Sequence, residues 1–411
     1  MLLKKNTAQK ERLDRVARLY LAYKFFGALY FAYPIFYEFA SQSITPVQVG
    51  IFFSLIGLAG FIAEIPTGIF ADKQSRKSSG LLGVAILCIA PLIVFFGHTF
   101  TAYLIAALFY GLGRALLSGA LESLVYDHKD IPKAAFRRVN AMEITFGQAG
   151  IFVSAACGGL MFLLNPGLPF IAEACAGVIT LILIFAMTEQ NNSDYVKPTA
   201  SYRKHFVESV KHLFATAYLR AVVLMGITFS VMLGMCIQLV NEATMIEQGL
   251  QADTRGFLIS GAGIATLIIL NAFLLKLVKG DIERIIYLVG GAIIAYASMS
   301  TVIMPLFLFG YLLWSCLNAT SSFIRVMVHD HIPSSHRSTI ISNFKALAIL
   351  IGLGASVATG LLIEGAKTPR AAYAVFAAIT CLVLLPCAYW LITHLKRVNN
   401  LEDVNVDKTH A

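Results

Sequence analysis

Twelve apolar stretches dominate this chain of 411 residues, and each is long enough to cross a lipid bilayer as a helix. A helix that spans the hydrocarbon core needs about 20 consecutive apolar residues. With 58% hydrophobic and 13% charged residues, the chain cannot cover a soluble surface of this size. We therefore predict an all-α polytopic membrane protein. The predicted spans are residues 18–41, 47–70, 79–97, 101–125, 139–164, 168–188, 219–241, 254–277, 284–303, 305–327, 340–363 and 369–394.

The basic residues indicate which side of the membrane each connection faces. Of the 32 Lys and Arg residues, 26 lie on one side, in the N-terminal tail and in every second connection. Because short cytoplasmic loops collect Lys and Arg, both termini are predicted to be cytoplasmic. The net charge of +9 is then a topology signal, and no nucleic acid partner is expected. Three of the others are placed inside predicted spans, Lys24, Arg114 and Lys345, and three in external loops, Arg255, Lys367 and Arg370.

The longest internal connection, residues 189–218, is polar and basic and divides the spans six and six. We predict a cytoplasmic tail (1–17), a six-helix bundle (18–188), a central cytoplasmic loop (189–218), a second six-helix bundle (219–394) and a cytoplasmic tail (395–411). Local identities at an offset of 201 residues favour a duplicated transporter with its substrate site between the halves. They relate Tyr110 to Tyr311, Gly159 to Gly360, and Asp130-Ile131-Pro132 to His331-Ile332-Pro333.

The sequence lacks the motifs of several common activities and binding sites. The seven cysteines fall in apolar stretches without CxxC spacing, so no disulfide framework and no metal site are indicated. No P-loop and no H-E-x-x-H occur, so we expect neither ATP hydrolysis nor metalloprotease activity. We predict that the chain is not an enzyme and needs no cofactor. The first span has full length and follows a polar tail, so it is expected to remain as an anchor rather than be cleaved as a signal.

The connection after the second span carries a ten-residue motif, Gly68-Ile-Phe-Ala-Asp72-Lys73-Gln-Ser-Arg76-Lys77. It resembles the G-x-x-x-D-(R/K)-x-G-(R/K)-(R/K) loop of the major facilitator superfamily, with Ser75 where the family usually has Gly. A glycine lets helices approach closely, and an aspartate can face the positive end of another helix. A solvated charge run would account for Lys73 and Lys77 but not for the aspartate.

The resemblance implies the fold of that superfamily: twelve transmembrane helices in two six-helix bundles, similar to bacterial drug and efflux members. It also implies a latch that holds the halves in the outward-open state. In the family the Asp meets the eleventh helix, and the Arg meets a carboxylate at the end of the fourth, a role that Asp127 or Glu122 fits here. The latch residues implied are Gly68, Asp72, Arg76, Lys77, Glu122 and Asp127.

The span 139–164 contains a second pattern, which resembles the antiporter motif G-x(8)-G-x(3)-G-P-x-x-G-G of drug exporters. Three glycines match, whereas Ala141 and Ser154-Ala155 replace the first Gly and the G-P pair. Close packing of this helix is predicted, and proton antiport is implied less strongly. The matching glycines are Gly150, Gly158 and Gly159.

Ionisable groups inside a bilayer usually face a partner or a wet cavity. Arg114 is our first candidate for substrate binding or proton coupling, with a structural ion pair as the alternative. From the family's helix arrangement we expect Lys24 to pair with Glu143, and Lys345 with Glu64, unless both lysines snorkel to the interface. Glu64 is otherwise a candidate proton carrier, because burial favours the neutral form of a carboxylate.

The resemblance places the spans 18–41, 101–125, 219–241 and 305–327 around the central cavity. Tyrosines spaced by three or four share one face of the first span, where they either bind a flat substrate or pack. Aromatic and amide side chains with few charges suit a moderately sized organic molecule better than a simple ion. The candidate substrate-binding residues are Tyr23, Tyr30, Tyr33, Arg114, Gln238, Asn241, Trp314 and Asn318.

From these features we predict a secondary active transporter that moves a small organic molecule by alternating access, as a proton-coupled exporter. Two alternatives stay open: proton-coupled uptake of an anionic metabolite, and a non-transporting membrane receptor with the same fold. The expected partners are the organic substrate, protons and the lipid bilayer. We expect a multi-pass protein of the bacterial inner membrane that functions as a monomer.

Overall fold

A computed structural model describes residues 15–128, 131, 133–189, 214, 216–270, 275–321, 323–324, 327 and 337–409. Within these ranges all regular structure is helical. Ten of the helices described are long and apolar enough to cross a membrane, and Met304–Thr320 is a shorter apolar helix. The predicted all-α polytopic architecture is confirmed. Most of the predicted N-terminal tail and central loop lies outside the described residues, as do Asp130, Pro132 and His331-Ile332-Pro333.

The chain forms two compact units, and each includes a short segment of a span that the sequence assigns to the other half. Unit 1 comprises Met1–Ile44, Phe52–Lys197 and Gln251–Ser260, and unit 2 comprises Thr45–Ile51, Pro198–Leu250 and Gly261–Ala411. The first residues of the second span therefore group with unit 2, and the first residues of the eighth span group with unit 1. Each unit otherwise holds the six spans that the sequence assigns to it.

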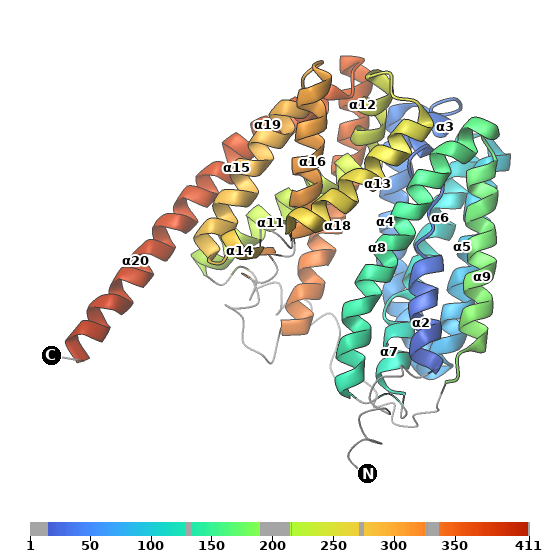
Figure 1. Cartoon of the computed structure of the whole chain (residues 1–411), viewed down its shortest axis with the longest axis horizontal. Helices are drawn as coiled ribbons and strands as arrows, with labels where there is room; N and C mark the ends of the chain where they lie inside the picture. The colour runs from blue at the N-terminus through green and yellow to red at the C-terminus, as the bar shows by residue number, and fades with distance from the viewer. Residues whose placement is uncertain are drawn as a thin grey trace, which may run out of the picture. The chain divides into compact units, whose positions relative to one another are not determined.

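Unit 1 is a bundle in which α5 packs against α6 and α9, while α2 packs against α8 and α9 (Figure 1). Its core joins apolar side chains from several of these helices, among them Leu21, Val84, Leu121 and Ile184. The helices are α2 (Arg15–Phe26), α3 (Phe36–Ala40), α4 (Pro46–Lys73), α5 (Arg76–Gly97), α6 (Phe100–Leu117), α7 (Ala120–Tyr126), α8 (Lys133–Leu164) and α9 (Leu168–Ala186).

The first predicted span is not one helix, which corrects the sequence prediction. α2 ends at Phe26 and α3 begins at Phe36, with turns between them. Pro34 lies in this break, and proline removes a backbone donor and disfavours a continuous helix. Non-helical backbone at membrane depth needs other hydrogen-bond partners. Here the Ala32 N–H donates to Glu173 Oε2 at 3.3 Å, and the Pro34 carbonyl accepts from Arg255 Nε at 3.2 Å.

The fourth predicted span is divided as well. α6 ends at Leu117, Ser118 has extended backbone angles, and Gly119 has a φ of 72° before α7 begins at Ala120. A left-handed conformation is readily adopted by glycine and strained for most other residues. The Ser118-Gly119 pair therefore ends one helix and starts the next within a single apolar stretch.

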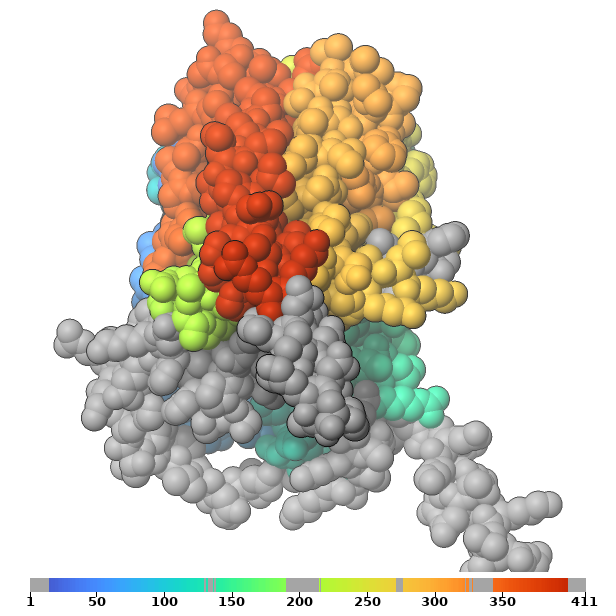
Figure 2. All heavy atoms as spheres, turned by 90° about the vertical axis from the view of Figure 1, so that its left-hand side faces the viewer, coloured from blue at the N-terminus to red at the C-terminus, as the bar shows by residue number. Residues whose placement is uncertain are grey.

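Unit 2 contains the remaining spans, and two of them include a π-helical turn. α15 packs against α16, α19 and α20, and α11 packs against α18. Figure 2 shows α15 and the chain from α19 into α20 side by side on one face. The elements are α11 (Ala217–Met235), η1 (Cys236–Val240), α12 (Asn241–Glu247), α13 (Ala252–Ile269), α14 (Leu275–Leu277), α15 (Asp281–Met299), α16 (Met304–Thr320), α18 (Arg337–Ala366), α19 (Arg370–Ile379), η4 (Thr380–Leu384) and α20 (Leu385–Thr409).

Large apolar side chains are exposed along the helices of both units. Phe96 and Phe185 in unit 1 and Leu382 and Tyr389 in unit 2 are each more than 70% exposed. Contiguous apolar surface on a soluble monomer is normally limited to small patches. Because helices on every side of a spanning bundle face lipid tails, this exposure is typical of a protein embedded in a bilayer.

Candidate functional site

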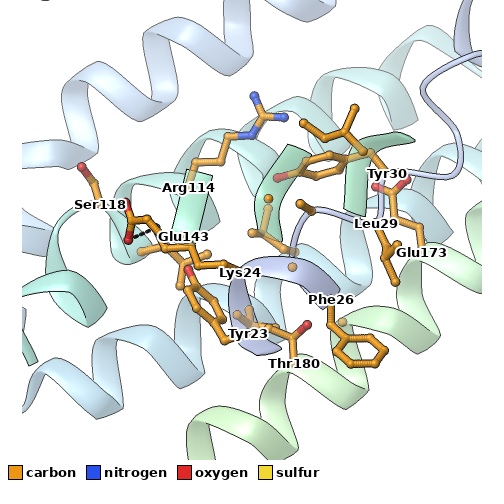
Figure 3. A pocket seen from close by; sticks show the side chains of 18 of the residues that line it. Tyr23, Lys24, Phe26, Leu29, Tyr30, Arg114, Ser118, Glu143, Glu173 and Thr180 are labelled. Atoms are coloured by element: carbon orange, nitrogen blue, oxygen red, sulfur yellow. Dashed lines mark ion pairs between the residues drawn. The ribbon is translucent and has the colours of Figure 1, made fainter. Parts of the chain in front are cut away.

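Unit 1 contains a cavity of about 640 Å³ between the break in the first span and the helices α5, α6, α8 and α9 (Figure 3). This volume lies in the range of pockets that bind small molecules, roughly 300–1,000 Å³. Apolar side chains form much of the wall, and tyrosines and four charged residues interrupt it. The charged residues are Lys24, Arg114, Glu143 and Glu173.

Two of the four charges pair with each other. Lys24 Nζ lies 3.4 Å from Glu143 Oε2, and both side chains are mostly buried. The same carboxylate accepts a hydrogen bond from the Tyr20 hydroxyl, and the ammonium lies 5.1 Å from the centre of the Tyr20 ring. The ion pair that the sequence predicts between these helices is therefore present, and the dashed line in Figure 3 marks it.

Arg114 lies in the last turn of α6 and is exposed to the cavity. Its guanidinium carbon is 6.0 Å from the centre of the Tyr110 ring, a distance typical of a cation–π contact. Among the residues that the structure describes, the guanidinium makes no ion pair. The alternative of a structural ion pair therefore receives no support from the described part of the chain.

Glu173 of α9 is a pocket residue that the sequence reasoning missed. Its carboxylate accepts from the Ala32 N–H and from the Tyr110 hydroxyl, each at 3.3 Å. Figure 3 shows it near Leu29 and Tyr30, and these two residues belong to the segment where the first span is not helical. The sequence does contain a signal for Glu173, since it is a carboxylate within the apolar stretch 168–188 and such groups usually face a partner or a cavity.

The two helix breaks explain how the cavity tolerates two cations. Lys24 lies in the last turn of α2 and Arg114 in the last turn of α6. The carboxyl-terminal end of a helix carries a partial negative charge, which stabilises a nearby cation. In a continuous helix neither side chain would lie near a carboxyl-terminal end, so the backbone would not provide this partial negative charge.

Of the predicted substrate-binding residues, the structure brings Tyr23, Tyr30 and Arg114 to this cavity. Tyr33 lies in the same helix break, half-buried, but does not line the cavity. Asn318 is half-buried on α16 of unit 2.

Three further candidates in unit 2 are engaged by neighbouring side chains. Gln238, in the π-helical turn η1, accepts a hydrogen bond from Ser356 at 3.2 Å. Asn241 is buried and accepts from the Tyr373 hydroxyl at 2.7 Å. Trp314 is buried too, and its ring stacks on Tyr311 with 5.4 Å between ring centres. Inside unit 2, then, the asparagine and the tryptophan contribute to packing.

The second predicted lysine–glutamate pair falls across the two units. Glu64 is exposed on α4 in unit 1, and Lys345 is exposed on α18 in unit 2. Their pairing stays a prediction. Glu64 does not line the cavity of unit 1, so that cavity holds other carboxylates than the one singled out as proton carrier.

The loop motif forms a network at one end of unit 1. Arg76 makes an ion pair with Asp127, and its guanidinium also donates to the Ser123 carbonyl at 3.0 Å. Its backbone N–H donates to Glu189 Oε1 at 2.7 Å, and the Ser75 hydroxyl donates to the same carboxylate. The arginine–carboxylate contact implied by the family resemblance is present, and Glu189 is an additional partner that the motif did not indicate.

Two other members of the motif behave differently. Lys77 donates to the Phe185 carbonyl at 2.7 Å, so it is engaged within unit 1. Glu122 and Asp72 are exposed. A Cβ built on Gly68 would meet no described atom within 4 Å. The close helix approach expected at Gly68 is therefore not present among the described residues, since the helix surface is open there.

The glycines of α8 do make the close contacts predicted for them. A Cβ at Gly150 or Gly158 would collide with the carbonyl oxygen of Phe25 or Phe31, at the end of α2 and in the break that follows it. A Cβ at Gly159 would collide with the carbonyl oxygen of Ala252, at the start of α13. Small residues let helix backbones approach within a membrane. α8 thus packs directly against the irregular backbone that borders the cavity.

In residues 15–128 and the other described ranges, no group of three or more His, Cys, Asp or Glu side chains is placed to hold a metal ion.

The fold is that of a polytopic helical membrane protein with two units, and unit 1 has a cavity of about 640 Å³ beside broken helices. The chain belongs to the major facilitator superfamily, whose family model matches residues 19–346. No curated protein sequence matches it significantly.

Solved structures with a similar fold share little sequence with this chain. A variant of the nucleoside transporter NupG is 13% identical, with a TM-score of 0.77, over 91% of this chain and 98% of that one. A bacterial homologue of the human lysosomal transporter Spinster, inward-facing and occupied, is 14% identical, with a TM-score of 0.66, over 92% and 96%. The human organic anion transporter TETRAN is 14% identical, with a TM-score of 0.64, over 91% and 99%. At these identities the likeness shows the fold alone.

Proposed function

We propose that this protein is a secondary transporter that exports a small organic molecule by alternating access and takes up protons in exchange. The observation that carries the proposal is the cavity of about 640 Å³ in unit 1, where two broken helices place charged side chains among tyrosines and apolar residues. Discontinuous helices form substrate and ion sites in many transporters. NupG is a nucleoside transporter and TETRAN an organic anion transporter, and both kinds of solute are organic molecules.

We place proton coupling on Glu143. Its carboxylate holds the Lys24 ammonium at 3.4 Å and accepts from the Tyr20 hydroxyl, so it links α2 to α8. A proton on this carboxylate removes the negative partner of Lys24 and frees the ammonium. Glu64 is less suited to the role, because it does not line the cavity.

The export direction rests on α8. Its three motif glycines resemble those of drug antiporters, and all three bring backbone segments into direct contact. A substitution there would alter the packing of α8 on the break in the first span, which borders the cavity.

One observation favours a second candidate, uptake of an anionic metabolite. Arg114 is exposed to the cavity without an ion pair among the described residues, and a guanidinium binds carboxylates and phosphates in a planar, two-point manner. Against this candidate, the cavity also carries two carboxylates, Glu143 and Glu173.

Transport in proteoliposomes tests the proposal. Purified protein is reconstituted and supplied with a panel of cationic, zwitterionic and anionic organic solutes, with and without a pH gradient. We expect an acidic compartment on one side to drive solute toward that side, as exchange requires, and Glu143→Gln to remove the dependence on the gradient while flux down a solute gradient persists. Accumulation on the side opposite the acid would indicate symport and favour uptake. Absence of flux for every solute would support a receptor instead.

A further inference from the structure

The unit 1 cavity is lined by two cations and two anions, but only one cation and one anion form an ion pair. Lys24 and Glu143 form an ion pair, whereas Arg114 and Glu173 do not pair with each other or with another described residue. The guanidinium lies over the ring of Tyr110, and the hydroxyl of the same tyrosine donates to Glu173. One cation and one anion therefore flank a single tyrosine and remain separate.

Neither hydrogen-bond donor of Glu173 carries a charge, and no described cation forms an ion pair with it. Both donors, the Ala32 N–H and the Tyr110 hydroxyl, are neutral, and both distances are 3.3 Å, at the long end for such bonds. Charged groups in apolar surroundings are normally paired, because an isolated charge there is expensive to desolvate. The carboxylate is only half-buried, so the cavity gives access to it.

Apolar and aromatic side chains occupy the wall between the charged groups. Phe26, Leu29, Tyr30 and Leu87 line the same cavity. Figure 3 shows Tyr30 and Glu173 among the side chains that line the cavity. An aromatic ring in the wall can attract an ammonium group by a cation–π interaction.

We propose that this cavity binds a zwitterion, an amino acid or short peptide with an apolar side chain, with its ammonium on Glu173 and its carboxylate on Arg114. Such a molecule neutralises both unpaired charges at once. A simple organic cation would leave Arg114 uncompensated, and a simple anion would leave Glu173 uncompensated. The inference rests on the proposed function and names the class of solute that the transporter carries.

Binding to the purified full-length protein in detergent tests the proposal without requiring transport. The probes are L-phenylalanine and L-alanyl-L-phenylalanine, each with its carboxyl amide, which keeps only the positive charge, and its N-acetyl derivative, which keeps only the negative charge. Calorimetric titration measures affinity. We expect at least one zwitterion to bind about tenfold or more tightly than either of its singly charged derivatives, since each charge-assisted bond contributes about that factor or more.

Two charge-neutralising variants assign the two ends of the solute. Glu173→Gln is expected to weaken zwitterion binding about tenfold or more and to leave binding of the N-acetyl derivative almost unchanged. Arg114→Gln is expected to do the reverse, leaving the amide derivative almost unchanged. Glu364→Gln and Arg397→Gln are matched controls, because both residues are exposed in unit 2.

Each outcome decides for or against the zwitterion. Equal affinity for a zwitterion and its amide, no binding of any probe, or control and cavity variants with the same effect would each overturn the assignment. Zwitterion binding without flux in proteoliposomes would overturn the transport function and keep the site. Flux of cationic solutes alone would keep the transport function and overturn the zwitterion site.

Discussion

Arg255 shows at the scale of one residue how charge supports irregular backbone in this protein. The sequence places it in an external loop, yet its side chain is 2% exposed in the first turns of α13. It pairs with Glu38 and donates to the carbonyl of Pro34, in the break of the first span. Arg255 lies in the first turns of α13 and not in a loop, and its guanidinium is buried because it has partners in and beside the break of the first span.

Replacing Arg255 is therefore expected to destabilise unit 1. Arg255→Leu removes the donor to the Pro34 carbonyl and one partner of Glu38, and leaving such groups without partners costs about 1–3 kcal/mol. Thermal unfolding of the purified protein measures the change as a lower midpoint. Arg397→Leu, at an exposed site, serves as the control. Equal midpoints for the two variants would contradict the role given to Arg255.

The glycines of α8 allow an internally controlled prediction. Gly158→Ala is expected to lower the unfolding midpoint, because the new methyl group would collide with the carbonyl of Phe31. Gly147→Ala, on the same helix, meets no described atom within 4 Å and gains about 0.5–1 kcal/mol of helix propensity. Thermal unfolding of both variants should show opposite shifts. Two shifts in the same direction would argue against backbone contact at Gly158.

At the scale of elements, the breaks in the first and fourth spans create the site. Each break turns a residue inside a predicted span into a last-turn residue, so the helix dipole stabilises Lys24 and Arg114. The first break also brings backbone near α9, where Glu173 accepts from Ala32. The cavity thus depends on where two helices stop.

Gly119 tests the break in the fourth span. Gly119→Ala is expected to destabilise the protein by about 1–2 kcal/mol, because alanine is strained at a φ of 72°. Gly119→Asn should cost less, since asparagine tolerates the left-handed region better. No described atom lies within 4 Å of a Cβ at this position, so steric collision does not confound the comparison. Unfolding midpoints should rank glycine first, then asparagine, then alanine; equal midpoints would show that the turn imposes no strain.

The sequence predicted the fold and one ion pair of the cavity, but it did not predict the helix breaks or Glu173. Apolar runs, basic residues and the ten-residue motif were sufficient for the fold, because each is a local signal with a known physical cause. The pairing of Lys24 with Glu143 followed from helix adjacency in the family. Hydropathy does not show a helix break, however, since Gly27, Pro34 and Ser118-Gly119 are embedded in apolar runs. Glu173 was missed because its role depends on the break in another span.

At the scale of the whole chain, a glycine contact of the same kind occurs in both units. Gly159 and Gly360 are 201 residues apart in the sequence. Gly159 packs on the start of α13 within unit 1, and Gly360 packs on the start of α4 within unit 2. The repeat that the sequence indicates therefore has a structural counterpart, in which each unit takes up the first residues of a helix that continues in the other unit.

Conformational exchange between the units is the role implied for the loop motif. Asp72 is exposed and lies outside the Arg76 network. Asp72→Asn is expected to abolish flux in proteoliposomes while the protein remains in the membrane at normal levels, because the latch that the family resemblance implies requires a negative charge facing a helix terminus. Asp253→Asn, with an aspartate in the first turn of α13, is a control of equal charge change. Undiminished flux of the Asp72 variant would remove it from the latch.

The repeated glycine contact gives a prediction for both units together. Gly159→Ala and Gly360→Ala should each lower the unfolding midpoint, since a methyl group at Gly360 would lie 2.6 Å from the Pro46 carbonyl oxygen. The contacts share no residues, so the destabilisations of the double variant should add within about 0.5 kcal/mol. Gly354→Ala, on the same helix with no described atom within 4 Å, is the control. Each contact lies within one unit, so the two contacts are expected to be independent. A double variant no less stable than either single variant would contradict that independence.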